Sequence, residues 1–139
     1  MKRLSIALLF VALFAAAAFA EVKDFGAFRV DVPAGWTAEQ DGETVGIVKN
    51  DNTAAVSITY DSADGASAKE IAEAYMGELK GRNLQGADNA FTFEMTNANG
   101  VDSTCYVFAD EGKYALIVAT GKENAPDEVD AIINSLDDD

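Results

Sequence analysis

The sequence predicts an α+β fold, in which an antiparallel sheet of six or seven strands carries two main helices packed on it. Stretches that alternate apolar and polar residues recur along the chain and are separated by turn residues. Two other stretches place apolar residues at helical spacing, one opening at Ser67 and one near Pro126. No repeat, linker or low-complexity stretch divides residues 21–139, so we expect them to form a single domain.

Residues 1–20 have the features of a secretory signal peptide. The basic pair Lys2-Arg3 precedes an apolar stretch over residues 4–17, and Ala18-Phe19-Ala20 is typical of a cleavage site before Glu21. An uncleaved membrane anchor is the alternative, because the run from 4 to 20 reaches the shortest length that spans a bilayer. The sequence therefore predicts cleavage between Ala20 and Glu21.

The residue after the predicted cleavage site also bears on the compartment. A bacterial lipoprotein would carry a cysteine there, whereas this chain has Glu21, so we expect a periplasmic or secreted protein without a lipid anchor. Cys105 is the single cysteine, which excludes a disulfide within the chain. Its apolar neighbours in 105–109 favour a buried, inert thiol over a catalytic thiolate, which would need a histidine partner.

Four strands are predicted in the first half of the domain. Residues 28–32 alternate apolar and polar, and Pro33-Ala34-Gly35 ends that strand. Asp41-Gly42 supplies the turn of a hairpin. The predicted strands are 28–32, 36–40, 45–49 and 54–61. Trp36, at the corner after the first strand, is expected to be buried rather than to anchor an interface.

A first helix is predicted to begin at Ser67. Ser67-Ala68-Lys69-Glu70 matches the capping box, in which the serine and glutamate side chains bind free helix N–H groups. An apolar stripe follows at Ile71, Tyr75 and Leu79, with Ala68, Ala72 and Met76 beside it. Gly81 stands where a glycine cap would end the helix. Gly77 costs about 1 kcal/mol relative to alanine, which close approach of that turn to the sheet would offset.

The second half of the domain predicts a three-stranded meander in the middle of the sheet and a closing helix. Its strands are 91–96, 101–109 and 114–120, with a type I′ turn at Asn99-Gly100 between the first two. Pro126 is well placed as the first residue of the last helix. The apolar stripe of that helix is Val129, Ile132, Ile133 and Leu136. Asp137 to Asp139 is expected to be a solvated tail that attracts cations weakly.

Charge and composition exclude several classes of function. All 24 acidic residues but only eight of the 10 basic residues follow residue 20, which gives 21–139 a formal charge of −16. Nucleic acids and anionic lipids need clustered basic residues, so neither is an expected partner. The chain has no histidine, which excludes Ser-His-Asp and Cys-His catalysis, H-E-x-x-H zinc sites and histidine-ligated haem. Phosphate-binding loop motifs and nucleophile elbows are also absent.

A calcium site is the nearest candidate for a cofactor. The many carboxylates could supply oxygen ligands, and the loop 61–65 holds Asp61 and Asp64. The loop fails the EF-hand register, because Ala63 takes the third position and Ala66 the position of the invariant glycine. A turn that enters the first helix is therefore favoured, and no cofactor is expected, with weak calcium binding as the alternative.

A candidate binding surface consists of polar residues on the solvent-facing sides of predicted strands. Two helices need not cover both faces of a sheet, and an uncovered face would be lined by these side chains. The members of this surface are Arg29, Asp31, Ser57, Thr59, Thr92, Glu94 and Thr96. A plain solvated face of an antiparallel sheet is the alternative.

The order of these elements resembles the PsbP-like superfamily. The elements are a strand ending in Phe28-x-Val30-x-Val32-Pro33-x-Gly35-Trp36, a hairpin, a helix opened by Ser67, a Phe-rich meander, and a closing Ile132-Ile133-x-Ser135-Leu136 helix. That superfamily includes bacterial DcrB-type periplasmic proteins and the plant photosystem extrinsic protein. The resemblance implies an α/β sandwich and an accessory or binding role. DcrB-type members are commonly lipoproteins, so their membrane tether does not transfer to this chain.

The function expected from these observations is that of a non-enzymatic, soluble periplasmic accessory or binding protein. It would engage a protein partner or a small ligand as a monomer or weak homo-oligomer, without stable membrane insertion after cleavage. A divalent-cation-binding envelope protein is the alternative, motivated by the charge of −16. A hydrolase that uses two carboxylates is the least favoured hypothesis.

Overall fold

The computed structural model describes residues 20–110 and 112–136. The predicted signal peptide lies outside these residues except for Ala20, and so does the acidic tail 137–139. Among the described residues, no helix is both long and apolar enough to cross a membrane.

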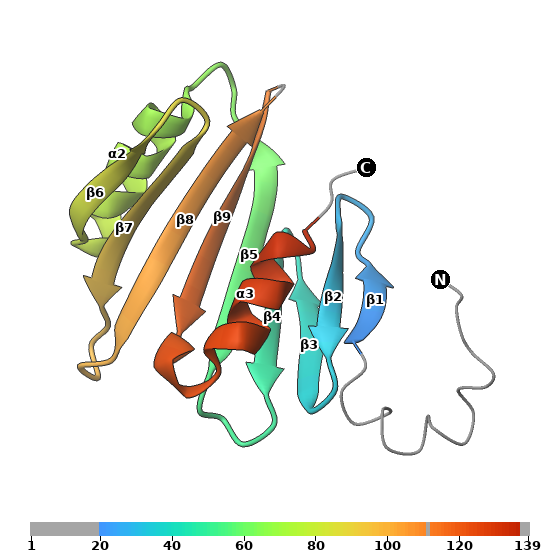
Figure 1. Ribbon diagram of the computed structural model, residues 1–139. Helices are drawn as coiled ribbons and strands as arrows, with labels where there is room; N and C mark the ends of the chain where they lie inside the picture. The colour runs from blue at the N-terminus through green and yellow to red at the C-terminus, as the bar shows by residue number, and fades with distance from the viewer. Residues whose placement is uncertain (1–19, 111, 137–139) are drawn as a thin grey trace, which may run out of the picture.

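Seven antiparallel strands form the main sheet, in the spatial order β3-β4-β5-β9-β8-β7-β6 (Figure 1). The strands are β3 (Trp36–Asp41), β4 (Thr44–Lys49), β5 (Ala55–Ser62), β6 (Arg82–Ala87), β7 (Ala90–Thr96), β8 (Asp102–Asp110) and β9 (Lys113–Thr120). With two helices packed against this sheet, the α+β class predicted from the sequence is confirmed.

The first predicted strand does not join the main sheet. β2 (Arg29–Pro33) pairs instead with β1 (Ala20–Asp24), a strand that the sequence pattern did not predict, and the two form a separate antiparallel ribbon. β2 turns Val30 and Val32 into the core, where both are buried. The apolar alternation of this strand was therefore recognised correctly, but its pairing partner was not.

β9 is the central strand of the sheet. It pairs with β5 on one side, with Ile58 opposite Ile117, and with β8 on the other, with Tyr106 opposite Ile117. The predicted meander of β7, β8 and β9 therefore fills one half of the sheet, and only its last strand is central. The prediction placed the whole meander in the middle, because nothing local in the sequence indicates that β5 pairs with β9.

Helix α2 (Ala68–Leu79) begins as the sequence predicted. The Ser67 hydroxyl accepts a hydrogen bond from the Glu70 N–H at 3.1 Å, and the Ser67 N–H donates to the Glu70 carboxylate at 2.9 Å. These two bonds complete the capping box. Ile71 and Ala72 are buried against β7 and β8, so the helix covers the β6-β7-β8 half of one sheet face.

The two glycines of this region have different roles from those predicted. Lys80, with φ of 58°, takes the left-handed position that ends the helix, and not Gly81. Gly81 is needed for close packing, since a Cβ there would overlap the Phe93 ring and the Glu94 carbonyl oxygen. Gly77 is exposed and a Cβ there would meet no atom within 4 Å, so no close approach offsets its cost.

The turn between β7 and β8 is longer than the predicted two-residue type I′ turn. That turn type needs positive φ at both Asn99 and Gly100, and only Gly100 has it. The Asn97 side chain organises the loop instead, because its amide oxygen accepts hydrogen bonds from the N–H groups of Asn99 and Val101, at 2.8 and 3.0 Å. This side-chain bonding stabilises a five-residue connection over residues 97–101.

Helix α3 (Pro126–Asn134) follows a short 3₁₀ turn, η2 (Lys122–Asn124), and has the proline at its first position as predicted. Val129 and Ile132 are fully buried. The Ser135 hydroxyl accepts a hydrogen bond from the Asp31 N–H at 2.8 Å, which ties the end of α3 to β2. Together, α3 and the β1–β2 ribbon cover the side of the sheet opposite α2 (Figure 1).

The two faces of the sheet are covered on opposite halves. Cross-strand partners share a face, so Ile58, Ile117 and Tyr106 lie on the α3 face, while Ser57 and Val118 lie on the α2 face. The ribbon and α3 cover the β3-β4-β5-β9 half of their face, whereas α2 covers the β6-β7-β8 half of the other. One open half-face therefore remains on each side of the molecule.

Candidate functional site

A groove lies where α3 meets the open half of its sheet face. We call it the α3 groove; its volume is about 470 Å³, which is within the usual range for binding sites. Its lining residues come from β5, the β7 to β9 region and the end of α3: Tyr60, Asn89, Ala90, Phe108, Ala109, Asp110, Lys113, Tyr114, Ala115, Ile133, Asn134 and Leu136.

Phe108 dominates the groove. It lies on β8 opposite Ala90 of β7 and Ala115 of β9. These alanines are too small to cover the ring, which remains 37 % exposed. Ile133 and Leu136 form the other wall, and both also pack against the core. The result is an apolar trough with one large, uncovered aromatic side chain.

A second aromatic ring extends this surface along β8. The rings of Tyr106 and Phe108 are nearly parallel, at 11°, with centroids 6.5 Å apart. The Lys122 ammonium donates a hydrogen bond to the Tyr106 hydroxyl at 3.2 Å and pairs with the Asp130 carboxylate at 3.2 Å. The hydrogen bond to Tyr106, followed by the interactions with Asp130, raises the pKa of Lys122, although partial burial opposes this shift.

The polar residues of the groove lie at its rim. Asp110 and Lys113 are opposite each other at the end of the β8–β9 hairpin, and Asn89 and Asn134 add amide groups. An apolar trough with a few polar groups at its edge is the usual composition of a binding site. These groups can orient a bound molecule.

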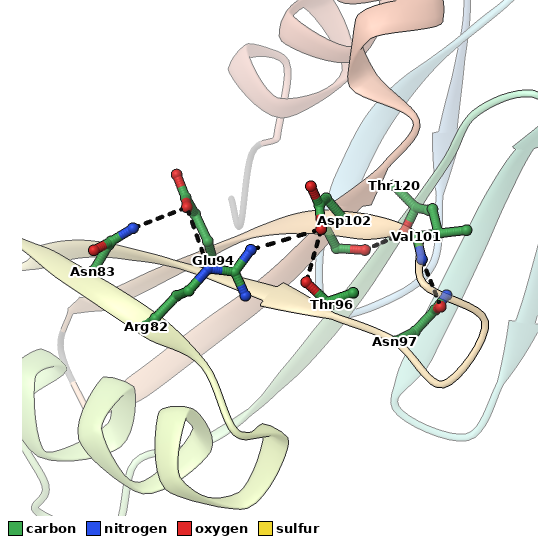
Figure 2. A network of polar contacts seen from close by, with 9 residues as sticks. Arg82, Asn83, Glu94, Thr96, Asn97, Val101, Asp102 and Thr120 are labelled. Atoms are coloured by element: carbon green, nitrogen blue, oxygen red, sulfur yellow. Dashed lines mark hydrogen bonds and ion pairs between the residues drawn. The ribbon is translucent and has the colours of Figure 1, made fainter.

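Farther along the same open half-face, Arg82 joins two carboxylates into a polar network (Figure 2). Its guanidinium lies 3.9 Å from Glu94 and 3.6 Å from Asp102. The Asn83 amide donates to Glu94 at 3.0 Å, and the Thr96 hydroxyl donates to Asp102 at 2.7 Å. The carboxylate of Glu94 is therefore engaged in holding β6 to β7.

The predicted polar surface is distributed over three places. Thr92, Glu94 and Thr96 lie on the α3 face, because Thr92 is opposite Tyr106. Ser57 and Thr59 lie on the α2 face, where the Thr59 and Thr44 hydroxyls are 2.8 Å apart. Arg29 and Asp31 belong to the separate ribbon. The structure does not bring these seven residues together into one surface.

The loop 61–65, the nearest sequence candidate for a calcium site, forms a turn into α2. The Asp61 carboxylate accepts a hydrogen bond from the Ser62 N–H at 2.7 Å, and the Asp64 carboxylate accepts one from the Ser62 hydroxyl at 3.0 Å. Across residues 20–110 and 112–136, no three cysteine or acidic side chains lie close enough together to hold a metal ion.

Cys105 and Trp36 are both buried, as predicted. Cys105 is fully buried on β8, and burial raises the pKa of its thiol to about 11. Trp36 is 7 % exposed and sits in the core beneath the ribbon and α3. Neither side chain is available to a partner at the surface.

The residues of the α3 groove were missed as a site in the sequence. Ile133 and Leu136 were predicted to belong to the core stripe of the last helix, and Phe108 to the strand 101–109 in the middle of the sheet. A usable signal was present, because Phe108 shares its strand face with Thr104, and the neighbouring strand carries Thr92 and Glu94 on that face. An aromatic residue on an otherwise polar face indicates an exposed apolar patch.

Comparisons with known proteins agree on the architecture. The structure aligns with cyanobacterial PsbP (CyanoP) from Synechocystis sp. PCC 6803 at a TM-score of 0.62, covering 86 % of this chain and 92 % of that one, with 12 % sequence identity. The fold is PsbP-like. A protein from Bacteroides thetaiotaomicron VPI-5482 aligns at a TM-score of 0.60 with 14 % identity, covering 88 % of this chain. The PsbP-like chain spans about half of that second protein, 49 %.

Comparisons of sequence add nothing to this result, because no family model and no curated protein matches the chain. At 12 and 14 % identity, the structural matches show the PsbP-like fold alone. The DcrB-type relationship stays a prediction.

Proposed function

We propose that this chain is a non-enzymatic accessory protein of the periplasm that binds a protein partner through the α3 groove. The observation that carries the proposal is the uncovered Phe108 ring in an apolar trough of about 470 Å³. Aromatic side chains, phenylalanine included, are enriched in the buried cores of protein interfaces. The uncovered half of the sheet face, which continues from Phe108 toward Tyr106, offers further area for contact.

Several features support a binding role over an enzymatic one. The chain lacks histidine, Cys105 is buried, and Glu94 is committed to Arg82 and Asn83. Periplasmic localisation rests on the signal-peptide features of residues 1–20. A cation-binding role has less support, since the described residues hold no ligand cluster.

Site-specific photocrosslinking in the native host tests this proposal. A benzoyl-phenylalanine at position 108 should give a discrete crosslinked protein band from the envelope fraction. The matched control carries the same probe at Val48, which is equally exposed at 37 % but lies on the other open half-face, where it lines a different groove. Equal crosslinking from both positions, or none from 108, would contradict the proposal. A small bound mass in native mass spectrometry would point to a small ligand instead.

A further inference from the structure

We propose that the α3 groove binds a partner segment in the polyproline II conformation, with apolar side chains three residues apart. This inference rests on the proposed function and specifies the conformation and chemistry of the partner segment. Three features of the groove support it: the order of side chains along its floor, two asparagine amides at its rim, and the balance of charge beside them.

The floor of the groove is one cross-strand row of the sheet, along which large and small side chains alternate. Tyr60 of β5 is opposite Ala115 of β9, and Phe108 of β8 is opposite both Ala115 and Ala90 of β7. All four residues line the groove. Ala115 is almost fully buried, at 3 % exposure, whereas Ala90 is exposed. The row therefore offers two low positions, one at each alanine, on either side of the Phe108 ring.

The distance between these two positions selects the backbone conformation of the occupant. Neighbouring strands are about 4.8 Å apart, so Ala115 on β9 and Ala90 on β7, with β8 between them, lie about 9.6 Å apart. A polyproline II segment points a side chain in the same direction every three residues, over about 9.3 Å. A β-strand does so over about 6.8 Å, which is too short. An α-helix comes near only over seven residues, at about 10.5 Å.

The rim of the groove favours a polyproline II segment over a helix. The Asn89 side chain lies on the β7 side of the groove and the Asn134 side chain on the α3 side. Both are exposed, and neither amide has a hydrogen-bond partner within residues 20–110 and 112–136. A helix pairs its backbone groups internally, whereas a polyproline II segment has no internal hydrogen bonds and leaves its carbonyl oxygens free. The two amides can donate to those oxygens.

Charge beside the groove favours a segment that is neutral at its centre. Asp110 and Lys113 are opposite each other at the end of the β8–β9 hairpin, so their charges offset each other. A charged side chain of the partner would lose its hydration on the apolar floor. This chain has only two prolines, Pro33 and Pro126, so a second copy offers no proline-rich segment. The occupant is therefore a neutral, proline-rich segment of another protein.

Peptide binding to the processed protein, purified from its host, tests the inference. Two labelled peptides have the same composition: the matched peptide is Pro-Pro-Leu-Pro-Pro-Leu-Pro-Pro, and the isomer is Pro-Pro-Leu-Pro-Leu-Pro-Pro-Pro. Only the matched peptide places both leucines on one face of a polyproline II helix. We expect it to bind about tenfold more tightly in fluorescence anisotropy, because the isomer can bury only one leucine. Equal affinities would overturn the inference.

Two variants with matched controls locate the binding. Ala90→Leu fills the outer position of the floor, and its control, Ala131→Leu, makes the same change at an exposed alanine of α3 outside the groove. Asn134→Ala removes a rim amide, and its control, Asn99→Ala, removes an exposed amide of the β7–β8 loop. The matched peptide should bind the two groove variants several-fold more weakly and both controls as tightly as the native protein. Losses of the same size in the controls would overturn the inference.

A helical peptide and the variant Phe108→Ser separate this inference from the proposed function. The helical peptide carries two leucines seven residues apart. If it binds more tightly than the matched peptide and Phe108→Ser weakens it, the groove binds a protein segment but the polyproline II conformation is wrong. Binding of the matched peptide that is unaffected by Phe108→Ser would also overturn the inference.

The crosslinking experiment at position 108 decides the remaining outcomes. If no peptide binds but the probe at 108 still crosslinks a discrete protein, this inference alone fails. If neither result is obtained, both proposals fail. A concentration-dependent dimer in sedimentation analysis that Phe108→Ser abolishes would identify a second copy as the occupant, and would overturn the polyproline II segment.

Discussion

The hydroxyl oxygens of Tyr75 on α2 and Tyr114 on β9 lie 2.8 Å apart, so a hydrogen bond joins the helix to the central strand. Their rings are also in contact, with centroids 6.1 Å apart. Burial, the hydrogen bond shared with Tyr75, and the nearby carboxylates of Asp61 and Glu43 raise the pKa of Tyr114 well above its usual value. The pair therefore adds a polar contact to the apolar packing of α2 on the sheet.

Removing one hydroxyl of this pair should destabilise the protein. Tyr75→Phe leaves the partly buried Tyr114 hydroxyl without its partner, and we expect a loss of about 1 kcal/mol in the free energy of unfolding. Urea denaturation measures it. The double variant Tyr75→Phe with Tyr114→Phe should cost less than the sum of the two single changes, because both act on one bond. Strict additivity would show that the bond contributes no coupling energy.

Ionisation of Tyr114 gives the protein a stability limit at high pH. The unfolded tyrosine ionises near pH 10, whereas the pKa of folded Tyr114 is raised. The contribution of Tyr114 to the free energy of unfolding is therefore fully present below about pH 10, and it falls as the pH rises above that value. Phenolate absorbance should show one tyrosine that titrates at unusually high pH, and Tyr75→Phe should lower the pKa of this group. Four identical titrations in the native protein would contradict this.

Cys105 should resist alkylation while the protein is folded. Its full burial and its pKa of about 11 leave almost no accessible thiolate at pH 8. We expect iodoacetamide labelling, followed by mass spectrometry, to be negligible in native protein and complete within minutes in concentrated urea. Rapid labelling with an unchanged circular dichroism spectrum would show that β8 opens to solvent.

Replacing Gly121 with alanine should lower the stability of the protein. Its φ is +70°, and a Cβ would overlap the Thr53 carbonyl oxygen in the loop that precedes β5. Gly42 is a matched control, with φ of +65° and no atom within 4 Å of an added Cβ. The left-handed conformation alone costs about 1 kcal/mol, so Gly42→Ala should lose about that much and Gly121→Ala clearly more. Thermal unfolding measures the stability of both variants. Equal losses would show that a Cβ at position 121 does not overlap the Thr53 carbonyl oxygen.

The carboxylate of Asp51 should titrate below the usual pKa of an aspartate. Hydrogen bonds from the Thr53 hydroxyl and backbone N–H, followed by the Lys49 ammonium, lower the pKa of Asp51 to about 2. A lowered folded pKa stabilises the protein above pH 4, and this contribution disappears as the pH falls toward 2. NMR titration of the Asp51 side chain measures the pKa. Thr53→Ala should raise it, whereas Asn52→Ala, in the same turn, should leave it lowered.

The strands that the sequence failed to predict are those that bury little. β6 is exposed along nearly all its length, has Asn83 in the left-handed region and shifts its register between Arg82 and Gln85. β1 exposes Val22 at 57 %. Neither strand has one consistently buried face, so neither produces the alternation on which the prediction depends. The strands with buried faces and both helices were predicted nearly to their ends.

The α3 groove could not be predicted because it depends on which half of the sheet face α3 covers. The apolar stripes indicated that α2 and α3 pack on the sheet, but stripe patterns do not specify which half of which face each helix covers. Phe108 is open only because α3 lies over β5 and β9 and stops short of β7 and β8. The pairing of β5 with β9, which places these strands side by side, joins residues 51 to 65 positions apart in the sequence.

The β5–β9 pairing also determines when the sheet can form during synthesis. Strands β3 to β5 and β6 to β8 can associate locally, but β9 lies between the two groups and is made last. Until residues 113–120 emerge, β5 and β8 each present an unpaired edge, which is the type of surface that pairs with other chains. A chain in which β9 has not yet paired is therefore especially prone to aggregation, because the two halves of the sheet depend on this strand to join them.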